Sequence, residues 1–111
     1  MKIEQFDIWL ADLNPARGIE PGKTRSVVII QTDLLNDVHP PTIICPVTTN
    51  VESEINILRV HLQKEQLKKL SDILVDQIRA IDNRRHIRKL GRLASNQIWE
   101  LRDNLKIVLD V

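Results

Sequence analysis

The chain has 111 residues, of which 42% are apolar and 28% charged, and its formal net charge is +1. This length predicts a single domain, 1–111, with a modest core. The small net charge disfavours a non-specific nucleic-acid binder, which usually carries a large basic excess. No segment approaches the roughly 20 apolar residues that span a bilayer, and Met1–Gln5 lacks the apolar stretch of a signal peptide. We therefore expect a cytoplasmic protein that does not contact membranes.

Short apolar segments separated by turn signals predict a compact sheet or barrel. The expected strands are Asp7–Leu13, Arg25–Gln31, Thr42–Val47, Ile57–Leu62, Ile73–Val75 and Gln77–Asp82, with a short turn at Thr32–Asn36. Val27–Ile30 is apolar throughout, which predicts a central strand covered on both faces. Alternation within Ile57–Leu62 predicts that Leu58, Val60 and Leu62 are buried. Arg59 and His61 are then expected on a solvent-facing side.

A glycine-containing loop, Asn14–Thr24, separates the first two expected strands and ends at Arg25. A loop able to move, ending in a guanidinium fixed at the start of a buried strand, is suited to binding a phosphate on a rigid scaffold. The loop is neither a Walker loop nor a dinucleotide fingerprint, because only Gly18 and Gly22 occur and a strand follows directly. Arg25 is therefore a candidate phosphate-binding residue outside the nucleotide-cofactor enzymes.

The second half of the chain contains a basic run and a helix. From Arg79 to Arg92 six basic residues accompany one acidic residue, and this run is either a solvated turn, a partner-facing surface or a track for phosphates. A helix is expected to begin after Ser95 as its N-cap. Its apolar stripe consists of Ile98, Leu101, Leu105 and Val108, with Trp99 beside it.

The spacing of cysteine and histidine predicts no metal site. Cys45 is the only cysteine and lies in an apolar segment, so we expect a buried and unreactive thiol. His39, His61 and His86 are widely separated, which predicts no metal and no cofactor. Each histidine is expected to be a surface residue rather than a general acid or base.

Several stretches together resemble a known family. They are Asp7–Pro15, Gly18–Gln31 with Glu20, Gly22, Thr24 and Arg25, then Pro46–Thr49, Asp76–Asp82, Leu90–Leu93 and the terminal helix. Each is short, but their order and spacing are specific, and nearly the whole chain resembles the MazF/PemK family of ribosome-independent endoribonuclease toxins from bacterial toxin–antitoxin pairs. The resemblance implies a mainly β (α+β), SH3-like small barrel with a C-terminal helix and one or two short helices.

The same resemblance implies a symmetric homodimer that cleaves single-stranded RNA at short sequences, without a metal, by attack of the 2′-hydroxyl. Its catalytic pair falls on Arg25 and Thr48. The implied RNA-contacting positions are Arg17, Gly18, Ile19, Glu20, Gly22, Lys23, Thr49, Gln77 and Arg79. A cognate antitoxin with an acidic, disordered tail is expected to cover the RNA site. The surface expected to receive that tail or RNA phosphates consists of Arg84, Arg85, Arg88, Lys89 and Arg92.

Physical chemistry limits what the implied pair does. A guanidinium fork stabilises charge on a pentacoordinate phosphorus, but it stays protonated at neutral pH and is a poor base. We therefore assign Arg25 to phosphate stabilisation, with proton donation as a second role, and leave the general base unassigned. The Thr48 hydroxyl is suited to donating to a phosphoryl oxygen or orienting the 2′-hydroxyl.

Four positions depart from the family pattern: Ile19 replaces a small polar residue, Pro21 a glutamine, Ser26 a proline and Phe6 a glycine. Ile19 and Pro21 change the hydrogen bonding and stiffness of the loop, so the base preference does not transfer. Two alternatives remain. A gyrase poison like CcdB is disfavoured because the chain ends Leu109-Asp110-Val111 with Trp99 inside the helix. A degenerate barrel that only binds RNA or protein is disfavoured by the presence of both Arg25 and Thr48.

Overall fold

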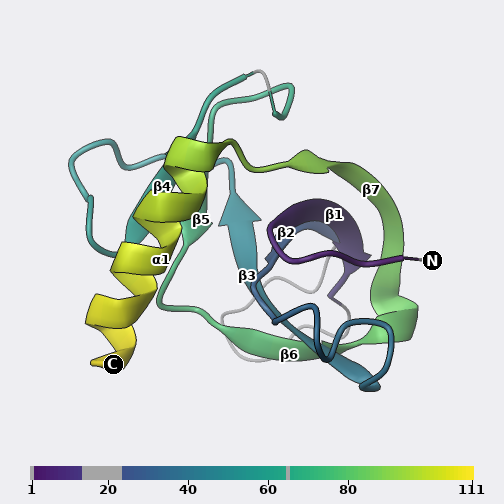
Figure 1. Cartoon of the computed structure of the whole chain (residues 1–111). Helices are drawn as coiled ribbons and strands as arrows, with labels where there is room; N and C mark the ends of the chain where they lie inside the picture. The colour runs from purple at the N-terminus through teal and green to yellow at the C-terminus, as the bar shows by residue number, and fades with distance from the viewer. Residues whose placement is uncertain (1, 14–23, 65) are drawn as a thin grey trace.

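The computed structural model describes residues 2–13, 24–64 and 66–111, which form a mainly antiparallel β structure with one C-terminal helix (Figure 1). The elements are β1 (Asp7–Asp12), β2 (Thr24–Ile29), β3 (Pro41–Thr48), β4 (Arg59–Leu62), β5 (Ser71–Leu74), β6 (Arg79–Asp82), the 3₁₀ helix η1 (Asn83–Arg85), β7 (His86–Arg92) and α1 (Ser95–Leu109). The strand order is β4-β5-β3-β2-β1-β7, and β6 pairs with β3. The predicted fold class is confirmed, although within the described ranges no strand pair joins β4 to β7 to close the barrel.

Two apolar clusters lie on the two faces of the curved sheet. Val28 belongs to the cluster that packs under α1, whereas Val27 and Ile29 belong to the cluster on the other face, and all three are fully buried. This confirms the expectation that β2 is central and covered on both sides. In α1, Leu101 is fully buried and the rest of the predicted stripe, Ile98, Leu105 and Val108, packs against the first cluster.

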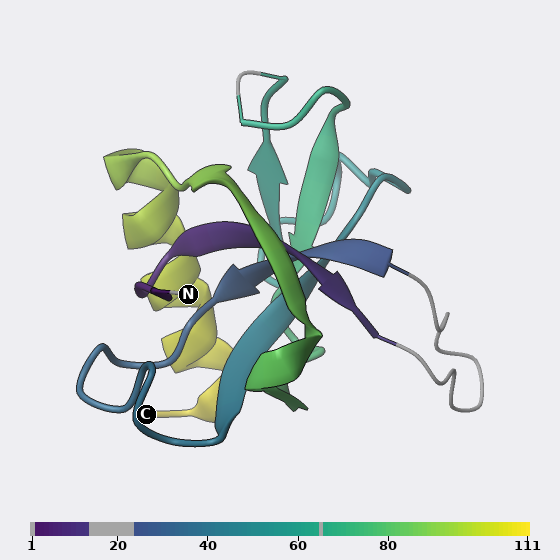
Figure 2. The ribbon, with the colours of Figure 1, turned by 90° about the vertical axis from the view of Figure 1, so that its right-hand side faces the viewer.

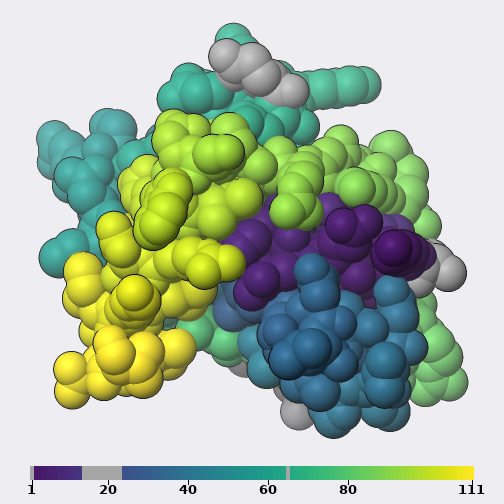
Figure 3. Space-filling model, in the orientation of Figure 1, coloured from purple at the N-terminus to yellow at the C-terminus, as the bar shows by residue number. Residues whose placement is uncertain are grey.

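The helix α1 and the start of β2 lie at opposite sides of the molecule. Figure 2 shows α1 on one side of the sheet and the beginning of β2 on the opposite side. Figure 3 shows that α1, the N-terminal segment and the turn after β2 cover the face viewed there. Arg25, at the second position of β2, is therefore remote from the helix.

The start of α1 differs from the prediction. Ala94 occupies the N-cap position, and Ser95 is the first helical residue. The Gln97 side chain folds back, and its Oε1 accepts a hydrogen bond of 2.8 Å from the Ala94 N–H. A glutamine in the first turn thus satisfies a backbone donor at this end, so a serine N-cap is not needed here.

Phe6, where the family resemblance implies glycine, has a φ of 70°, which lies in the left-handed region that favours glycine. Its ring is nonetheless buried in the first cluster, and the Arg102 guanidinium lies 5.1 Å from the ring centroid. Burial of an aromatic ring and this cation–π contact offset the backbone strain.

The prediction for Ile57–Leu62 is partly wrong. The strand begins only at Arg59, and Leu58 is 41% exposed because it lies in the preceding bend. Val60 and Leu62 are buried as expected. Arg59 and His61 do not face open solvent, because both contact the buried carboxylate of Asp72 on β5.

The basic run contains a strand that the sequence pattern did not reveal. β7 pairs with β1 across a separation of more than 70 residues, with register shifts between Ile8 and Trp9 and between Leu10 and Ala11. Such irregularities are β-bulges, which break the period-two alternation of a strand. The interpretation of this segment as a solvated turn is therefore wrong for His86–Arg92 and right only for the 3₁₀ turn before it.

Candidate active site

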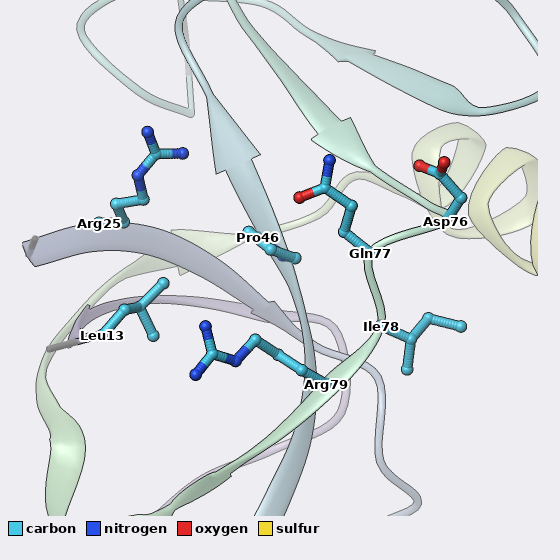
Figure 4. Close-up of a pocket in the computed structure, with 7 residues that line it drawn as sticks. All are labelled: Leu13, Arg25, Pro46, Asp76, Gln77, Ile78 and Arg79. Atoms are coloured by element: carbon cyan, nitrogen blue, oxygen red, sulfur yellow. The ribbon is translucent and has the colours of Figure 1, made fainter. Parts of the chain in front are cut away.

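A pocket of about 270 Å³ opens beside the start of β2. Its walls come from β2, β3, the start of β6 and the segments that follow β1 and β5, and it is lined by Leu13, Arg25, Pro46, Asp76, Gln77, Ile78 and Arg79. Figure 4 shows the Arg25 guanidinium and the Gln77 amide on either side of Pro46, with the Arg79 guanidinium extending toward Leu13. Two fork-shaped cations and one amide thus meet in one hollow, which suits binding of a phosphate beside a base or other polar group.

Arg25 is held by the central part of the sheet. Its backbone pairs with Ala11 of β1, and the next inward-facing residue of β2, Val27, is fully buried and paired with both β1 and β3. The side chain itself is half-buried. The cation therefore projects from a rigid base into the pocket, as the sequence predicted for a guanidinium at the start of a buried strand.

Thr48 is the last residue of β3 and does not line this pocket. The β2–β3 ladder ends at the pair Val27 and Pro46, and Arg25 and Thr48 each lie two residues beyond that pair on their own strands. The Thr48 Oγ1 accepts a hydrogen bond of 3.1 Å from the Asn50 N–H. Because the oxygen accepts this bond, the hydroxyl proton is directed elsewhere and is suited to donation toward a ligand.

The other residues predicted to contact RNA fall into three groups. Gln77 and Arg79 line the same pocket as Arg25. Thr49 is exposed and lines a second hollow on the other side of β2, together with Ser26 and Arg88. Arg17, Gly18, Ile19, Glu20, Gly22 and Lys23 lie outside the residues that the structure describes.

The second hollow, of about 470 Å³, contains basic residues that the sequence reasoning missed. Lys68 and Lys69 of the β4–β5 connection lie there beside Arg88. The lysine-rich segment before β5 was the available signal, but nothing in its spacing indicated that it would face a strand from the other end of the sheet. Cations therefore gather on both sides of β2, at Arg25 and at Arg88.

The five residues expected to form one basic patch do not share one surface. Their contacts are Arg84 to Asp82 (2.9 Å), Arg85 to the Asp12 carbonyl (3.1 Å), and Lys89 and Arg92 to Asp7 (3.3 and 3.4 Å). Arg88 instead lines the second hollow. Consecutive residues of a strand point to opposite faces, so Arg88 and Lys89 are separated by β7 itself. The five residues are therefore distributed over several places, and their binding of an antitoxin tail or RNA phosphates stays a prediction.

The histidines also differ from expectation. His39 is exposed as predicted, and His61 is half-buried with its Nδ1 2.6 Å from Asp72 Oδ1. His86 is only 3% exposed, packs edge-on against Trp9 with 5.8 Å between ring centroids, and is not a surface residue. It is buried because β7 pairs it with Ala11, on the face that holds the second apolar cluster.

Burial lowers the pKa of His86 below its ordinary value of 6.5, although Asp37 acts to raise it. The unfolded chain therefore takes up this proton first as the pH falls, so stability is lost on acidification below about pH 6.5. We expect His86→Phe to reduce the fall in unfolding free energy between pH 7.5 and 5.5, by at most about 1.4 kcal/mol per pH unit. Urea titrations at both pH values measure it, with His39→Phe as the exposed control. An equal pH dependence in wild type and His86→Phe would contradict this assignment.

Among the described residues, neither Cys45 nor a cluster of metal-ligating side chains forms a second candidate site. Cys45 is fully buried, and burial raises the pKa of its thiol to about 12, so it is an unreactive core residue as predicted. In residues 2–13, 24–64 and 66–111, no three His, Cys, Asp or Glu side chains lie where they would hold one metal ion. The one helix described is too short and too polar to cross a membrane.

Similarity to known proteins covers almost the whole chain. The family described as PemK-like, MazF-like toxins of type II toxin–antitoxin systems matches residues 4–109. The chain belongs to this toxin family. It is 37% identical over 109 residues to the endoribonuclease MazF of Staphylococcus epidermidis, covering 96% of this chain and 91% of that protein.

Two solved structures share the fold of this PemK-like, MazF-like chain. MazF from Deinococcus radiodurans superposes with a TM-score of 0.84 at 21% identity, covering 100% of this chain and 99% of the other. A MazE–MazF complex from the same organism gives 0.78 at 21% identity, with coverage of 100% and 99%. The family match, residues 4–109, includes every described residue of the Arg25 pocket, so the pocket lies within the matched toxin domain.

Proposed function

We propose that this toxin is a sequence-specific, metal-independent endoribonuclease that cleaves single-stranded RNA in the cytoplasm. The observation that carries the proposal is the pocket in which Arg25, fixed on the central strand β2, meets Gln77 and Arg79. The 37% identity to a protein named endoribonuclease MazF, extending over 96% of the chain, supports the same activity.

The pocket and the neighbouring Thr48 supply some of the groups that cleavage by the RNA's own 2′-hydroxyl requires. As that oxygen attacks phosphorus and the bond to the 5′-oxygen breaks, negative charge grows on the phosphoryl oxygens, where the Arg25 fork stabilises it, and the leaving 5′-oxygen takes up a proton, which is the second role proposed for Arg25. Thr48, which like Arg25 lies two residues beyond the Val27–Pro46 pair, is suited to donate a hydrogen bond from its hydroxyl to a phosphoryl oxygen or to orient the nucleophile. The general base is unassigned, because a guanidinium that stays protonated at neutral pH does not accept the proton of the 2′-hydroxyl.

Gln77 and Arg79 have positioning roles in this proposal. An amide that both donates and accepts is suited to reading a base edge, and single-stranded RNA exposes such edges. Arg79, on the far side of the pocket from Arg25, is suited to a neighbouring phosphate. The loop residues Arg17, Gly18, Ile19, Glu20, Gly22 and Lys23 are proposed to determine which bases are accepted, and the departures at Ile19 and Pro21 then change the target sequence.

The proposed partners are a second copy of the chain, forming a homodimer, and an antitoxin with an acidic disordered tail. Support comes from the solved MazE–MazF complex of Deinococcus radiodurans and from the cations on both sides of β2. An acidic tail across these hollows would neutralise them and compete with RNA. Weakening of RNA binding by an acidic peptide is expected, and simultaneous binding without mutual weakening would exclude competition.

The test of the proposed function uses a long, weakly structured RNA incubated with wild-type protein in EDTA, followed by mapping of the cut ends. Attack by the 2′-hydroxyl leaves a 2′,3′-cyclic phosphate on one fragment and a 5′-hydroxyl on the other, and we expect both ends at a short recurring sequence. Cleavage that requires added metal would contradict the mechanism. Absence of cuts across many sequences would favour a barrel that only binds RNA or protein.

A further inference from the structure

The connection that follows Thr48 is anchored by a buried charged network. Asp72 lies on β5, directly opposite Thr48 of β3 in one ladder and opposite His61 of β4 in the next. Its side chain is fully buried. Residues opposite each other in antiparallel pairs face the same side of a sheet, so His61, Asp72 and Thr48 form one row across three strands.

The carboxylate of Asp72 uses both oxygens within this network. Oδ1 lies 2.6 Å from His61 Nδ1, and Oδ2 accepts hydrogen bonds from the Glu52 N–H at 2.9 Å and from Arg59 at 3.1 Å. Glu52 is four residues beyond Thr48, so one buried anion fixes the far end of the turn that begins at Thr48.

Arg59 fixes the middle of the same turn. Its Nη1 donates to the Asn50 carbonyl at 2.7 Å and to Asp72 at 3.1 Å, and its Nη2 lies 3.6 Å from the Glu52 carboxylate. The N–H of Asn50 in turn donates to the Thr48 hydroxyl oxygen at 3.1 Å. Arg59 is therefore connected to the Thr48 hydroxyl through one residue.

From this geometry we propose that Arg59 and Asp72 are positioning residues that orient the Thr48 hydroxyl for RNA cleavage. The inference rests on the proposed function and adds two residues that do not line the Arg25 pocket. Arg59 holds the Asn50 backbone in place through its hydrogen bond to the Asn50 carbonyl. The Asn50 N–H therefore donates to the Thr48 oxygen from a fixed direction, and this sets the direction in which the Thr48 hydroxyl proton points. A misplacement of about 1 Å at a reacting group costs up to about 100-fold in rate, so a turn held at both ends has a catalytic consequence.

Fold stability alone does not require a charged network at this place. Burying two ionic groups is costly, and a well-packed apolar pair of similar volume is often as stable. The ionic pair instead fixes the geometry of the turn. The Arg59 guanidinium donates to both the Asn50 carbonyl and the Asp72 carboxylate, and that carboxylate accepts a hydrogen bond from the Glu52 N–H. The network therefore binds the backbone of the turn that follows Thr48.

A double-mutant cycle tests whether Arg59 acts through Thr48. The substrate is a short single-stranded RNA that carries one cleavage site mapped with the wild-type protein, and kcat and KM are measured separately for Arg59→Met, Thr48→Ala and the double variant. We expect Arg59→Met to lower kcat about 10-fold with KM changed less than twofold, and Thr48→Ala to lower kcat about 100-fold. The double variant should match Thr48→Ala alone, because Arg59 has nothing left to orient.

The control for lost charge is Lys106→Met, an exposed residue of α1 that should retain wild-type kcat. Thermal unfolding verifies that each variant is folded; if Arg59→Met is not, Arg59→Lys, which keeps the charge without the fork, replaces it in the cycle. A further 10-fold loss of kcat when the Arg59 variant is added to Thr48→Ala would overturn positioning while leaving the nuclease function intact. An inactive wild-type protein would overturn both.

Discussion

Arg25→Ala is expected to lower kcat/KM for RNA cleavage by about 1,000-fold, the effect of removing one preorganised donor from a transition state that gains negative charge. The side chain lies half-buried in the pocket on a backbone paired with β1, so its geometry is fixed before RNA binds. The measurement is the initial rate on the mapped single-site RNA in EDTA.

Two further variants test whether the loss of rate is due to the missing guanidinium. Arg25→Lys keeps the positive charge but not the planar fork, so we expect an intermediate loss of about 100-fold. Lys106→Ala removes a cation from α1, on the opposite side of the molecule from the start of β2, and should leave the rate unchanged. Wild-type rates in Arg25→Ala, in a preparation that melts like the wild type, would remove Arg25 from the mechanism.

The parts of the fold that sequence predicts well are those decided by local apolar periodicity. The continuous apolar run of β2 and the stripe of α1 headed by Leu101 both lie where the pattern placed them, because burial on two faces or on one stripe leaves a local signature. β7 left no such signature. Its partner β1 is far away in sequence, and bulges interrupt its alternation, so its charged residues resembled a solvated turn.

Residues of the candidate site could be predicted from the sequence only where a local pattern marked them. Arg25 was found from a loop that runs into a buried strand, and it lies in the pocket. Thr48 came from family resemblance, because a threonine in a strand has no distinctive environment until the β2–β3 register is known. The network around Asp72 was not predictable, since alternation alone indicated that Arg59 and His61 would face solvent, and only the pairing of β4 with β5 places a buried carboxylate between them.

Substitution of Asp72 is expected to have the largest effect on the stability of the protein. Asp72→Asn should lower the free energy of unfolding by about 4 kcal/mol at pH 7, because removing one partner of a buried ion pair leaves the other uncompensated. The remaining partner, Arg59, has a side chain only 14% exposed, and the amide keeps only one acceptor oxygen where the carboxylate uses two, for the Glu52 N–H, Arg59 and His61. Asp103→Asn, at an exposed position of α1, is the matched control and should stay within about 0.5 kcal/mol of wild type.

The stability that the Asp72 carboxylate contributes should be lost at acidic pH. Burial by itself acts to raise the pKa of Asp72, but hydrogen bonds from the Glu52 N–H, His61 and Arg59 outweigh it and lower the pKa below its ordinary value of 3.8. A lowered carboxyl pKa contributes stability that is complete above the unfolded value and is lost as the pH falls through the folded value. The difference in unfolding free energy between wild type and Asp72→Asn should therefore shrink below about pH 4, as measured by urea unfolding at pH 7, 4 and 2.5. A difference that stays constant down to pH 2.5 would show that Asp72 stabilises the protein by its shape rather than by its charge.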